Sequence, residues 1–444
     1  MNYYDIVNIV FWCISAVTAL LLIHFIVFSI IGVFKRKKFP KTDTKLKYGL
    51  IIPARNEEQV VGNLIASIYK NNYPQDKLQV FVIAHNCTDR TAEIAREMGA
   101  TVYEYNNPKE NTMGFAFRYL FERIKEDYGT ENYDGFFLFN ADNILSVDYI
   151  DKMNDAFVAC DRKSVITSFR NSKNFSSNCI SGLYGIYFMT GCRLESRGRT
   201  VVGCSTRVQG TGYVISSDIV KDGWPYVTLT EDWEFSADQV LKGNKIIYCD
   251  EAVFYDEQPT TIKVMLRQRL RWAKGHLLVC LTKGKALLKK LFSKNKTNEK
   301  SNKFSVYDIF INCMPICVIT TTLWLLQLIL IAFSPLFGID AGIVWRQWAI
   351  GFGITAAVSY LLLVLNAILI FIIERKRIKN VGFWKGALMT LMWPFFIMIS
   401  IPIEFVALFS KNVGWKTIPH TDTTNFEQLN EKIEVVDEDN VKAL

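Results

Sequence analysis

Three long stretches without a charged side chain constrain this sequence more than any other feature. They cover Ile6 to Val33, Ile309 to Ile339 and Gln347 to Ile373, and they are 28, 31 and 27 residues long. A helix needs about 20 apolar residues to cross the hydrocarbon core of a bilayer. A secretory signal peptide has a shorter apolar part that follows a positive start. The sequence therefore predicts a multi-pass membrane protein.

Basic residues indicate how the chain is oriented. Lys35 to Lys38 follow the first apolar run, the lysine-rich stretch from Lys283 to Lys303 precedes the second, and Glu374 to Arg377 closes the third. Such positive segments stay on the cytoplasmic side of a membrane. We therefore expect an N-terminus outside the plasma membrane and a cytoplasmic region between the first two runs.

A fourth apolar run, Gly386 to Ile403, has 18 residues and contains Pro394 and Pro402. It is long enough to span, but a kinked segment embedded in the inner leaflet is favoured, because broken helices are tolerated when they are buried against protein. This choice leaves the C-terminus in the cytoplasm. The acidic, polar stretch from Asn425 to Leu444 is expected to be disordered.

The region from Tyr48 to Gln258 alternates short apolar runs with helical stretches. The expected strands are 49–53, 78–84, 101–105 and 135–139, and the expected helices are 57–69, 91–98 and 115–125. This alternation indicates an α/β domain with a mostly parallel sheet and helices on both faces. Ligands of such sheets bind at the carboxyl ends of the strands.

Polar side chains follow three of these expected strands. Arg55 and Asn56 come after the first, His85 to Asp89 after the second, and Asn140 to Asn143 after the fourth. A carboxylate at a strand end, such as Asp142, can hold a divalent cation that bridges diphosphate oxygens. The alternative is an ordinary Asp/Asn turn.

Two later stretches carry further chemistry. Glu231, Asp232 and Glu234 open an expected helix; they are either ordinary acids of a first helical turn or contain a general base. Gln268, Arg271 and Trp272 share one face of an expected helix from Thr261 to Val279. That face can bind phosphate and stack on a sugar, or it can simply lie on a membrane surface.

Charge and cysteine pattern argue against a nucleic-acid-binding protein, a zinc-binding protein and a disulfide-rich protein. The net charge is +8, but the Lys and Arg residues cluster beside apolar runs, which favours a membrane surface over a nucleic-acid partner. The ten cysteines are scattered and form no CxxC pairs, so neither a zinc site nor a disulfide framework is expected. Free thiols are typical of a reducing cytosol.

Taken together, these residues resemble the membrane-embedded processive branch of the family 2 glycosyltransferases, which includes cellulose, hyaluronan and chitin synthases. The resemblance rests on the order of weak motifs from Tyr48 to Trp272, and it continues more loosely to His420. The motifs are Pro53-Ala54-Arg55-Asn56-Glu57, Asn86-Cys87-Thr88-Asp89, the Asp142 turn, Gly210-Thr211-Gly212, Thr230-Glu231-Asp232 and Gln268-Arg269-Leu270-Arg271-Trp272.

The resemblance implies a doubly wound GT-A-like domain fused to interfacial and transmembrane helices. We expect an N-terminal transmembrane helix with its basic flank over residues 1–38 and the catalytic domain over 45–258. Interfacial helices are expected over 259–303, and two transmembrane helices with the embedded segment over 304–410. A gating-loop-like motif and the acidic tail occupy 411–444.

The resemblance also implies a role for each matching position. Asp232 is the expected base that deprotonates the acceptor hydroxyl, and Asp142 is the expected ligand of Mg²⁺ or Mn²⁺. The expected donor-binding residues are Pro53, Ala54, Arg55, Glu57, His85, Asp89, Asn140, Gln268 and Arg271. The expected acceptor-binding residues are Gly210, Thr211, Gly212, Glu231 and Trp272, and the gating-loop match is Trp415, Lys416 and Thr417.

Three positions depart from the family pattern. Asn140 stands where the family has the first acid of its DxD motif, His85 where it has Asp, and Met113 where it has Lys. Asn keeps an oxygen ligand but lacks the charge, so metal affinity could fall. The base and the Gln-Arg-Trp face are unchanged, and an active enzyme is expected.

The expected function is inverting transfer from a UDP-sugar, with UDP-glucose favoured, to a growing β-glucan that leaves through the membrane. The alternatives are polymerisation of UDP-N-acetylglucosamine, transfer of a single sugar to a lipid, and a non-catalytic protein that binds nucleotide sugars. The donor, the glycan and the bilayer are the expected partners. Asn312, Gln327 and Asn366, within the apolar runs, either line the polymer's route or join helices by hydrogen bonds.

Overall fold

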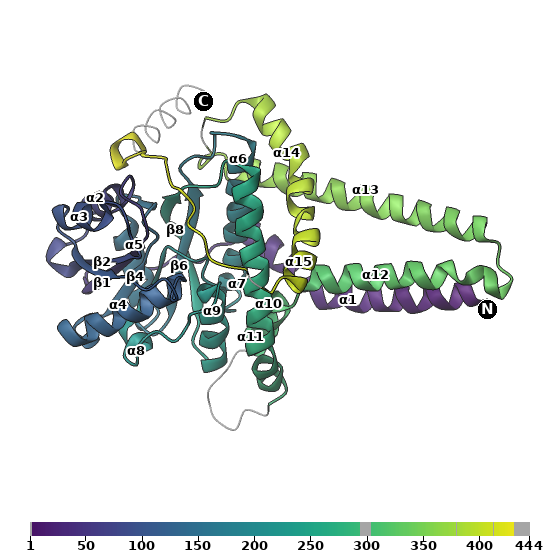
Figure 1. The fold of residues 1–444 in the computed structure, drawn as a ribbon, viewed down its shortest axis with the longest axis horizontal. Coiled ribbons are helices and arrows are strands. Elements are labelled where there is room, and N and C mark those ends of the chain that lie inside the picture. Colours follow the sequence, from purple (N-terminus) through teal and green to yellow (C-terminus); the bar gives the residue numbers. More distant parts are fainter. Residues whose placement is uncertain (1, 294–302, 379, 412, 430–444) are drawn as a thin grey trace.

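The computed structural model describes residues 2–293, 303–378, 380–411 and 413–429, and most of the acidic tail expected over 425–444 lies outside them. An α/β domain forms one end of the molecule, and long apolar helices project from its other end (Figure 1). The strands that the structure describes form one eight-stranded sheet in the order β3-β2-β1-β4-β7-β6-β8-β5.

The sheet is mostly parallel, as the sequence predicts. Parallel pairs join β1 to β2 and β4, β2 to β3, and β6 to β8, whereas β7 runs antiparallel to β4 and β6, and β5 antiparallel to β8. The strands are β1 Tyr48–Ala54, β2 Leu78–His85, β3 Thr101–Tyr105, β4 Gly135–Leu138, β5 Ile144–Leu145, β6 Val165–Ser172, β7 Tyr213–Ser216 and β8 Ile246–Asp256.

The expected helices of this domain are present with small shifts of their ends. The helix expected over 57–69 begins only at Val61, because the chain first makes a turn in which the Val60 and Val61 amides both donate to the Glu57 carbonyl oxygen. The helices are α2 Val61–Tyr69, α3 Thr91–Glu97, α4 Met113–Asp127, α5 Tyr149–Val158, α6 Cys179–Thr190, α7 Arg197–Val201, α8 Ser217–Val220 and α9 Glu231–Lys242.

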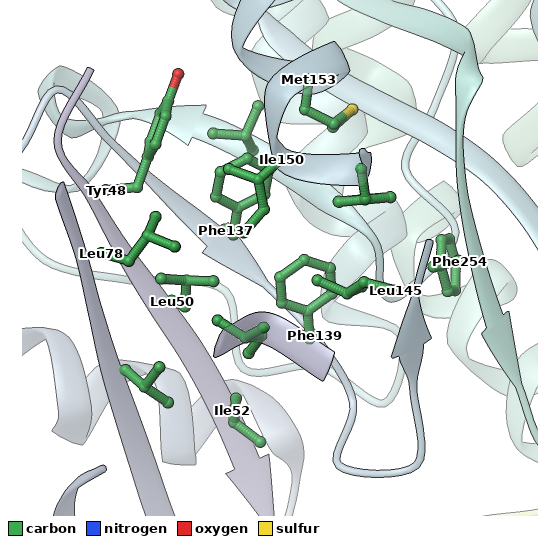
Figure 2. Packing of buried hydrophobic residues seen from close by; sticks show 14 of the residues in the cluster. Tyr48, Leu50, Ile52, Leu78, Phe137, Phe139, Leu145, Ile150, Met153 and Phe254 are labelled. Carbon is green, nitrogen blue, oxygen red and sulfur yellow. The ribbon is translucent and has the colours of Figure 1, made fainter. Parts of the chain in front are cut away.

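Apolar side chains cover both faces of the sheet. On one face, Leu50, Ile52 and Phe137 belong to a buried cluster that also contains Ile150 and Met153 of α5, and Figure 2 shows these side chains. On the other face, α4 packs on side chains that point the opposite way from the same strands. A strand that is buried on both sides lacks the polar alternation of a surface strand, which explains the continuous apolar runs in the sequence.

The remaining helices carry the apolar runs. They are α1 Tyr3–Phe34, α10 Ile262–Phe292, α11 Lys303–Cys313, α12 Ile316–Ala332, α13 Ala341–Ile373, α14 Phe383–Met398 and α15 Ser400–Phe409. Among the described residues, α1, α13 and the stretch Phe383–Phe409 are long and apolar enough to cross a membrane. The run expected as one helix over 309–339 instead bends by 62° between α11 and α12, where Pro315 cannot donate a helical hydrogen bond.

The long helices α1, α12 and α13 project in one direction, and α10, α14 and α15 lie across their base (Figure 1). The three polar residues within the apolar runs bond to protein groups. Gln327 bonds to Asn8 of α1, and Asn366 accepts a hydrogen bond from Trp393 of α14. Asn312 donates to Asp308 within α11. The contacts of Gln327 and Asn366 favour the helix-joining interpretation, whereas Asn312 bonds within its own helix and lines a cavity.

Close packing of α1 on α7 joins the first membrane helix to the α/β domain. A Cβ atom on Gly198 would overlap the Phe28 carbonyl oxygen of α1. We therefore expect Gly198→Ala to destabilise the protein by about 1–3 kcal/mol, the usual cost of overpacking. The melting temperature of the purified protein in detergent measures this effect.

Gly351→Ala in α13 is the matched control. Apart from the adjoining helix backbone, no atom of residues 2–293, 303–378, 380–411 or 413–429 lies within 4 Å of its Cβ position, so the added methyl group only improves helix propensity. If the Gly198→Ala protein melts no lower than the Gly351→Ala protein, the α1–α7 contact is not tight.

Candidate active site

The carboxyl ends of β2, β1 and β4 lie side by side, because these strands are neighbours in the sheet. A cavity of about 130 Å³ opens there, and we call it the strand-end cavity. It brings together most of the expected donor-binding residues with the gating-loop match. Its expected members are Pro53, Ala54, Arg55, Glu57, His85, Asn140, Asp142, Gln268, Arg271, Trp415, Lys416 and Thr417.

Arg55 and His85 form one end of this cavity. The Arg55 Nε atom donates to the His85 carbonyl oxygen (2.8 Å), and its Nη2 atom lies 2.9 Å from His85 Nδ1. Burial and the Arg55 charge lower the pKa of His85 to about 4, so its ring is neutral at physiological pH. Asn56 and Asn86, just after β1 and β2, adopt positive φ angles that Asn tolerates better than most residues.

Asn140 and Asp142 form the part of the cavity suited to a cation. Asp142 is 3% exposed, and the buried Asn140 Oδ1 atom has no hydrogen-bond partner in the part of the chain that the structure describes. An oxygen without a partner beside a carboxylate fits the oxygen ligands of Mg²⁺ or Mn²⁺. Among the described residues, no three His, Cys, Asp or Glu side chains form a complete metal site, so a bound cation would take its remaining ligands from water or from a bound molecule.

Residues 413–425, which we call the C-terminal strap, lie over the strand-end cavity. The Trp415 ring lies 4.5 Å from the Arg55 guanidinium, and the Thr417 carbonyl oxygen accepts a hydrogen bond from Arg267 on α10 (3.1 Å). The amides of Thr421 and Asp422 donate to the Glu257 carboxylate at the end of β8. The C-terminal strap therefore covers a cavity that is lined in part by residues at the end of β1, far earlier in the chain.

His420 fastens the strap to the loop after β1. Its Nδ1 atom lies 2.9 Å from both carboxylate oxygens of Glu57. Burial alone would lower the pKa of His420, but the carboxylates of Asp142, Glu57 and Glu257 raise it to about 9. A protonated His420 therefore offsets part of the negative charge gathered at this cavity.

A second cavity, of about 240 Å³, adjoins the first, and we call it the aromatic cavity. Gly210, Glu231, Asp232 and Trp272 line it, and a Cβ atom on Gly210 would lie 3.7 Å from Asp232 Oδ2. Burial and the Asp232 charge raise the pKa of Glu231 to about 8. Burial also raises the pKa of Asp232, while the Trp233 amide and the Arg271 guanidinium oppose that rise.

Helix α10 brings its Gln-Arg-Trp face to these acids by close packing at Gly275. A Cβ atom there would overlap the Thr230 side chain, so only Gly allows this approach. Arg271 consequently donates through Nη1 to the Leu229 carbonyl oxygen (2.7 Å), directly before the Thr-Glu-Asp turn. The buried Gln268 Oε1 atom has no hydrogen-bond partner among the residues described, so it is available to a ligand.

Aromatic residues of α6 fix the position of Trp272. The Tyr187 ring lies nearly parallel to the indole at 6.4 Å between centroids, and Tyr184 and Phe188 meet it edge-on at 6.1 Å. An indole held by three other rings is a rigid apolar plate. Asp232 and Trp272 both line the aromatic cavity.

The two cavities share a wall. Both are lined by Asn140, Gln268, Arg271 and Trp415 and also by Arg170, a residue of β6 that no motif indicated. The Arg170 Nε atom donates to Asp256 (2.7 Å), and its guanidinium lies 3.6 Å from the Phe188 ring centroid. Molecules bound in the two cavities would therefore lie next to each other beside these shared residues.

Three expected site residues do not line either cavity. The Asp89 carboxylate accepts hydrogen bonds from the Thr91 amide and hydroxyl, so it stabilises the start of α3. Thr211 is buried and accepts from the Asn140 amide (2.8 Å). Gly212 lies against the Phe254 ring, where a Cβ atom would overlap it. These residues do not line the cavities but support neighbouring parts of the chain.

Asp256, Glu257 and His420 line the strand-end cavity, although sequence reasoning missed them as site residues. Asp256 and Glu257 sit at the carboxyl end of β8, and the Glu257 amide donates to Asp142 (2.8 Å). The strand-end rule applied to 246–256 would have indicated this acidic pair. His420 lies in a loop, and no local signal marks it.

The mostly parallel sheet and the polar site at its strand ends define a GT-A-like glycosyltransferase fold. The family model described as "Glycosyltransferase like family 2" matches residues 46–275, which are 230 of the 444 residues, and the chain belongs to this family.

Two curated relatives illustrate the similarity. The probable glycosyltransferase YdaM of Bacillus subtilis is 26% identical over 242 residues, which are 53% of this chain and 56% of that protein. The 4,4'-diaponeurosporenoate glycosyltransferase of Staphylococcus aureus strain N315 is 42% identical over 77 residues, 16% of this chain and 20% of that protein. The chain thus spans little more than half of the first relative and a fifth of the second.

A solved structure covers more of the chain. The mannosyltransferase PcManGT of Pyrobaculum calidifontis, in complex with GDP-Man and Mn²⁺, aligns with 90% of this chain and 98% of its own, with a TM-score of 0.56. The sequences are 13% identical, so this likeness concerns the fold.

Proposed function

We propose that this protein is a membrane-bound, inverting glycosyltransferase that adds sugars from a UDP-sugar to the end of a growing β-glycan. UDP-glucose is the favoured donor and a β-glucan the favoured product, with UDP-N-acetylglucosamine as the runner-up. The catalytic domain would lie at the cytoplasmic face of the plasma membrane. The finer choice of donor and product rests on the motif order described above.

One observation carries the proposal. Asp232 and Trp272 line the aromatic cavity, which shares the wall at Asn140, Arg170 and Arg271 with the cavity that holds Asp142. A donor in the strand-end cavity would present its sugar at this wall, and an acceptor on Trp272 would present a hydroxyl there. Such positioning alone supplies a large part of the rate of a two-substrate reaction.

The residues suggest a single displacement. Asp232 takes the proton of the acceptor hydroxyl as that oxygen forms a bond to the anomeric carbon. The bond from the anomeric carbon to the diphosphate oxygen breaks, and UDP leaves with the electron pair. Arg271, at the shared wall, stabilises the negative charge of the departing diphosphate.

Asn140 and Asp142 would hold the divalent cation. A bound Mg²⁺ or Mn²⁺ would neutralise diphosphate charge as a Lewis acid. The Asn140 Oδ1 atom supports this assignment, because it is a buried oxygen that accepts no hydrogen bond from any described residue.

A second candidate is the transfer of one sugar to a lipid. A third cavity, of about 310 Å³, lies between α1, α10, α15 and the bend before α12, and apolar side chains form most of its lining. His276 lines both this cavity and the aromatic cavity. An apolar space next to an acceptor site suits a lipid tail, and one relative is named for diaponeurosporenoate.

Product analysis tests the proposal. Purified full-length protein is incubated with UDP-glucose, UDP-N-acetylglucosamine or GDP-mannose and with Mg²⁺ or Mn²⁺. We expect UDP-glucose to give a polymer that β-glucanases digest, and we expect EDTA to slow UDP release by about 100-fold or more. A glycolipid that carries one sugar would favour the second candidate. If no nucleotide is released from any of these donors, the proposal that the protein is an active glycosyltransferase fails.

A further inference from the structure

The Gln-Arg-Trp face of α10 continues beyond Trp272. His276 follows it by four residues, so it lies on the same face about 6 Å further along the helix. This rise is close to the length of one sugar ring. His276 also lines the cavity between the membrane helices, so this direction leads from the Asp232 carboxylate toward the membrane.

Trp233 packs against His276 at the lining of the aromatic cavity. The two rings are 4.2 Å apart between centroids, and the Arg207 guanidinium lies 5.1 Å from the Trp233 ring. All three residues line the cavity, although they come from α10, α9 and the loop before β7. An indole plate beside polar groups is a surface that fits a sugar, which has apolar ring faces and polar edges.

The polar groups of this cluster are held in place. Arg207 Nη2 donates to Glu195 (2.6 Å), and Arg207 Nη1 lies 3.4 Å from Asn312 Oδ1. Burial and the charges of Arg207 and Arg271 lower the pKa of His276 to about 3, so its ring is neutral. Within the described chain, neither ring nitrogen of His276 has a hydrogen-bond partner. A neutral imidazole offers one donor and one acceptor, which suits sugar hydroxyls.

We propose that Trp233, His276 and Arg207 form a second acceptor subsite, which binds the sugar unit next to the one on Trp272. This inference rests on the proposed function, in which Trp272 holds the terminal sugar. The subsite makes an acceptor of two sugars a better substrate than a single sugar. It also aligns the chain along α10, so the terminal hydroxyl stays directed at Asp232.

Acceptor length is the quantity to measure. With UDP-glucose as donor, kcat/KM is determined for cellobiose and for glucose with the full-length protein in detergent. We expect cellobiose to be favoured about tenfold, as one aromatic contact and one hydrogen bond would give. Trp233→Ala and His276→Ala are expected to reduce this ratio to about twofold or less, and Trp233→Phe to restore most of it.

Controls separate a subsite from a structural role. Trp233 also packs between α9 and α10, so the melting temperature of each variant is recorded. Trp384→Ala removes an 82% exposed indole of α14 and should leave the ratio at its wild-type value. A ratio that persists in Trp233→Ala and His276→Ala, or that Trp384→Ala lowers equally, overturns the subsite.

The test also distinguishes failure of the proposed function from failure of the subsite. If the wild-type protein releases no UDP from UDP-glucose with either acceptor, the proposed function with this donor has failed. If it transfers glucose but does not prefer cellobiose, only the subsite has failed. Stimulation by undecaprenyl phosphate, with a glycolipid carrying one sugar as the product, overturns the subsite in favour of a lipid acceptor.

Discussion

Replacement of Asp232 by Asn reduces the rate of sugar transfer by about a thousandfold, because the amide cannot accept the proton of the acceptor hydroxyl. Donor affinity should change little, since Asp232 lines the aromatic cavity and is absent from the lining of the strand-end cavity. Single-turnover transfer and calorimetric titration with UDP-glucose measure the two effects separately.

Glu231→Gln is the matched control for this change. Burial and the neighbouring carboxylate raise the pKa of Glu231, which favours its protonated form, and a protonated carboxyl group resembles the amide that replaces it. We expect this variant to keep activity within about tenfold of the wild type. Equal losses in both variants would argue against Asp232 as the base, and so would near-normal turnover in Asp232→Asn.

Replacement of Arg271 by Gln should lower kcat by about 100-fold or more and move the acid limb of the pH profile. The guanidinium lowers the pKa of Asp232, so its removal raises that pKa. A base with a higher pKa stays protonated to a higher pH. The acid limb of kcat/KM therefore moves toward higher pH, which a profile between pH 5 and pH 9 would detect.

Arg267→Gln separates this effect from a general loss of positive charge on α10. The Arg267 guanidinium donates to the Thr417 carbonyl oxygen of the C-terminal strap. We expect Arg267→Gln to weaken donor binding while the acid limb stays in place. An unshifted limb in Arg271→Gln, or equal shifts in both variants, would contradict the coupling between Arg271 and Asp232.

Much of the fold could be predicted because its signals are local. Apolar runs bounded by charges marked α1 and α13, and alternating short runs marked β1 to β4. The shared face of Gln268, Arg271 and Trp272 followed from helical spacing alone. The bend before α12 was missed, although Pro315 signals it, because the length of the apolar run outweighed the single proline.

The rest of the site depends on contacts between distant parts of the chain. His420 meets Glu57 across 363 positions, and Arg170 reaches Asp256 across 86. Neither spacing leaves a pattern in the sequence. Thr211 was expected at the acceptor but lies buried behind Asn140, because a motif gives the neighbourhood of a residue and not the direction of its side chain.

The position of the C-terminal strap determines when the strand-end cavity is completed during synthesis of the protein. Trp415, Lys416 and His420 complete the strand-end cavity, and they follow every apolar helix in the chain. Under the proposed function, a chain that ends before Trp415 would contain the whole sheet but only an incomplete donor site. Donor binding would therefore require the segment that follows α15.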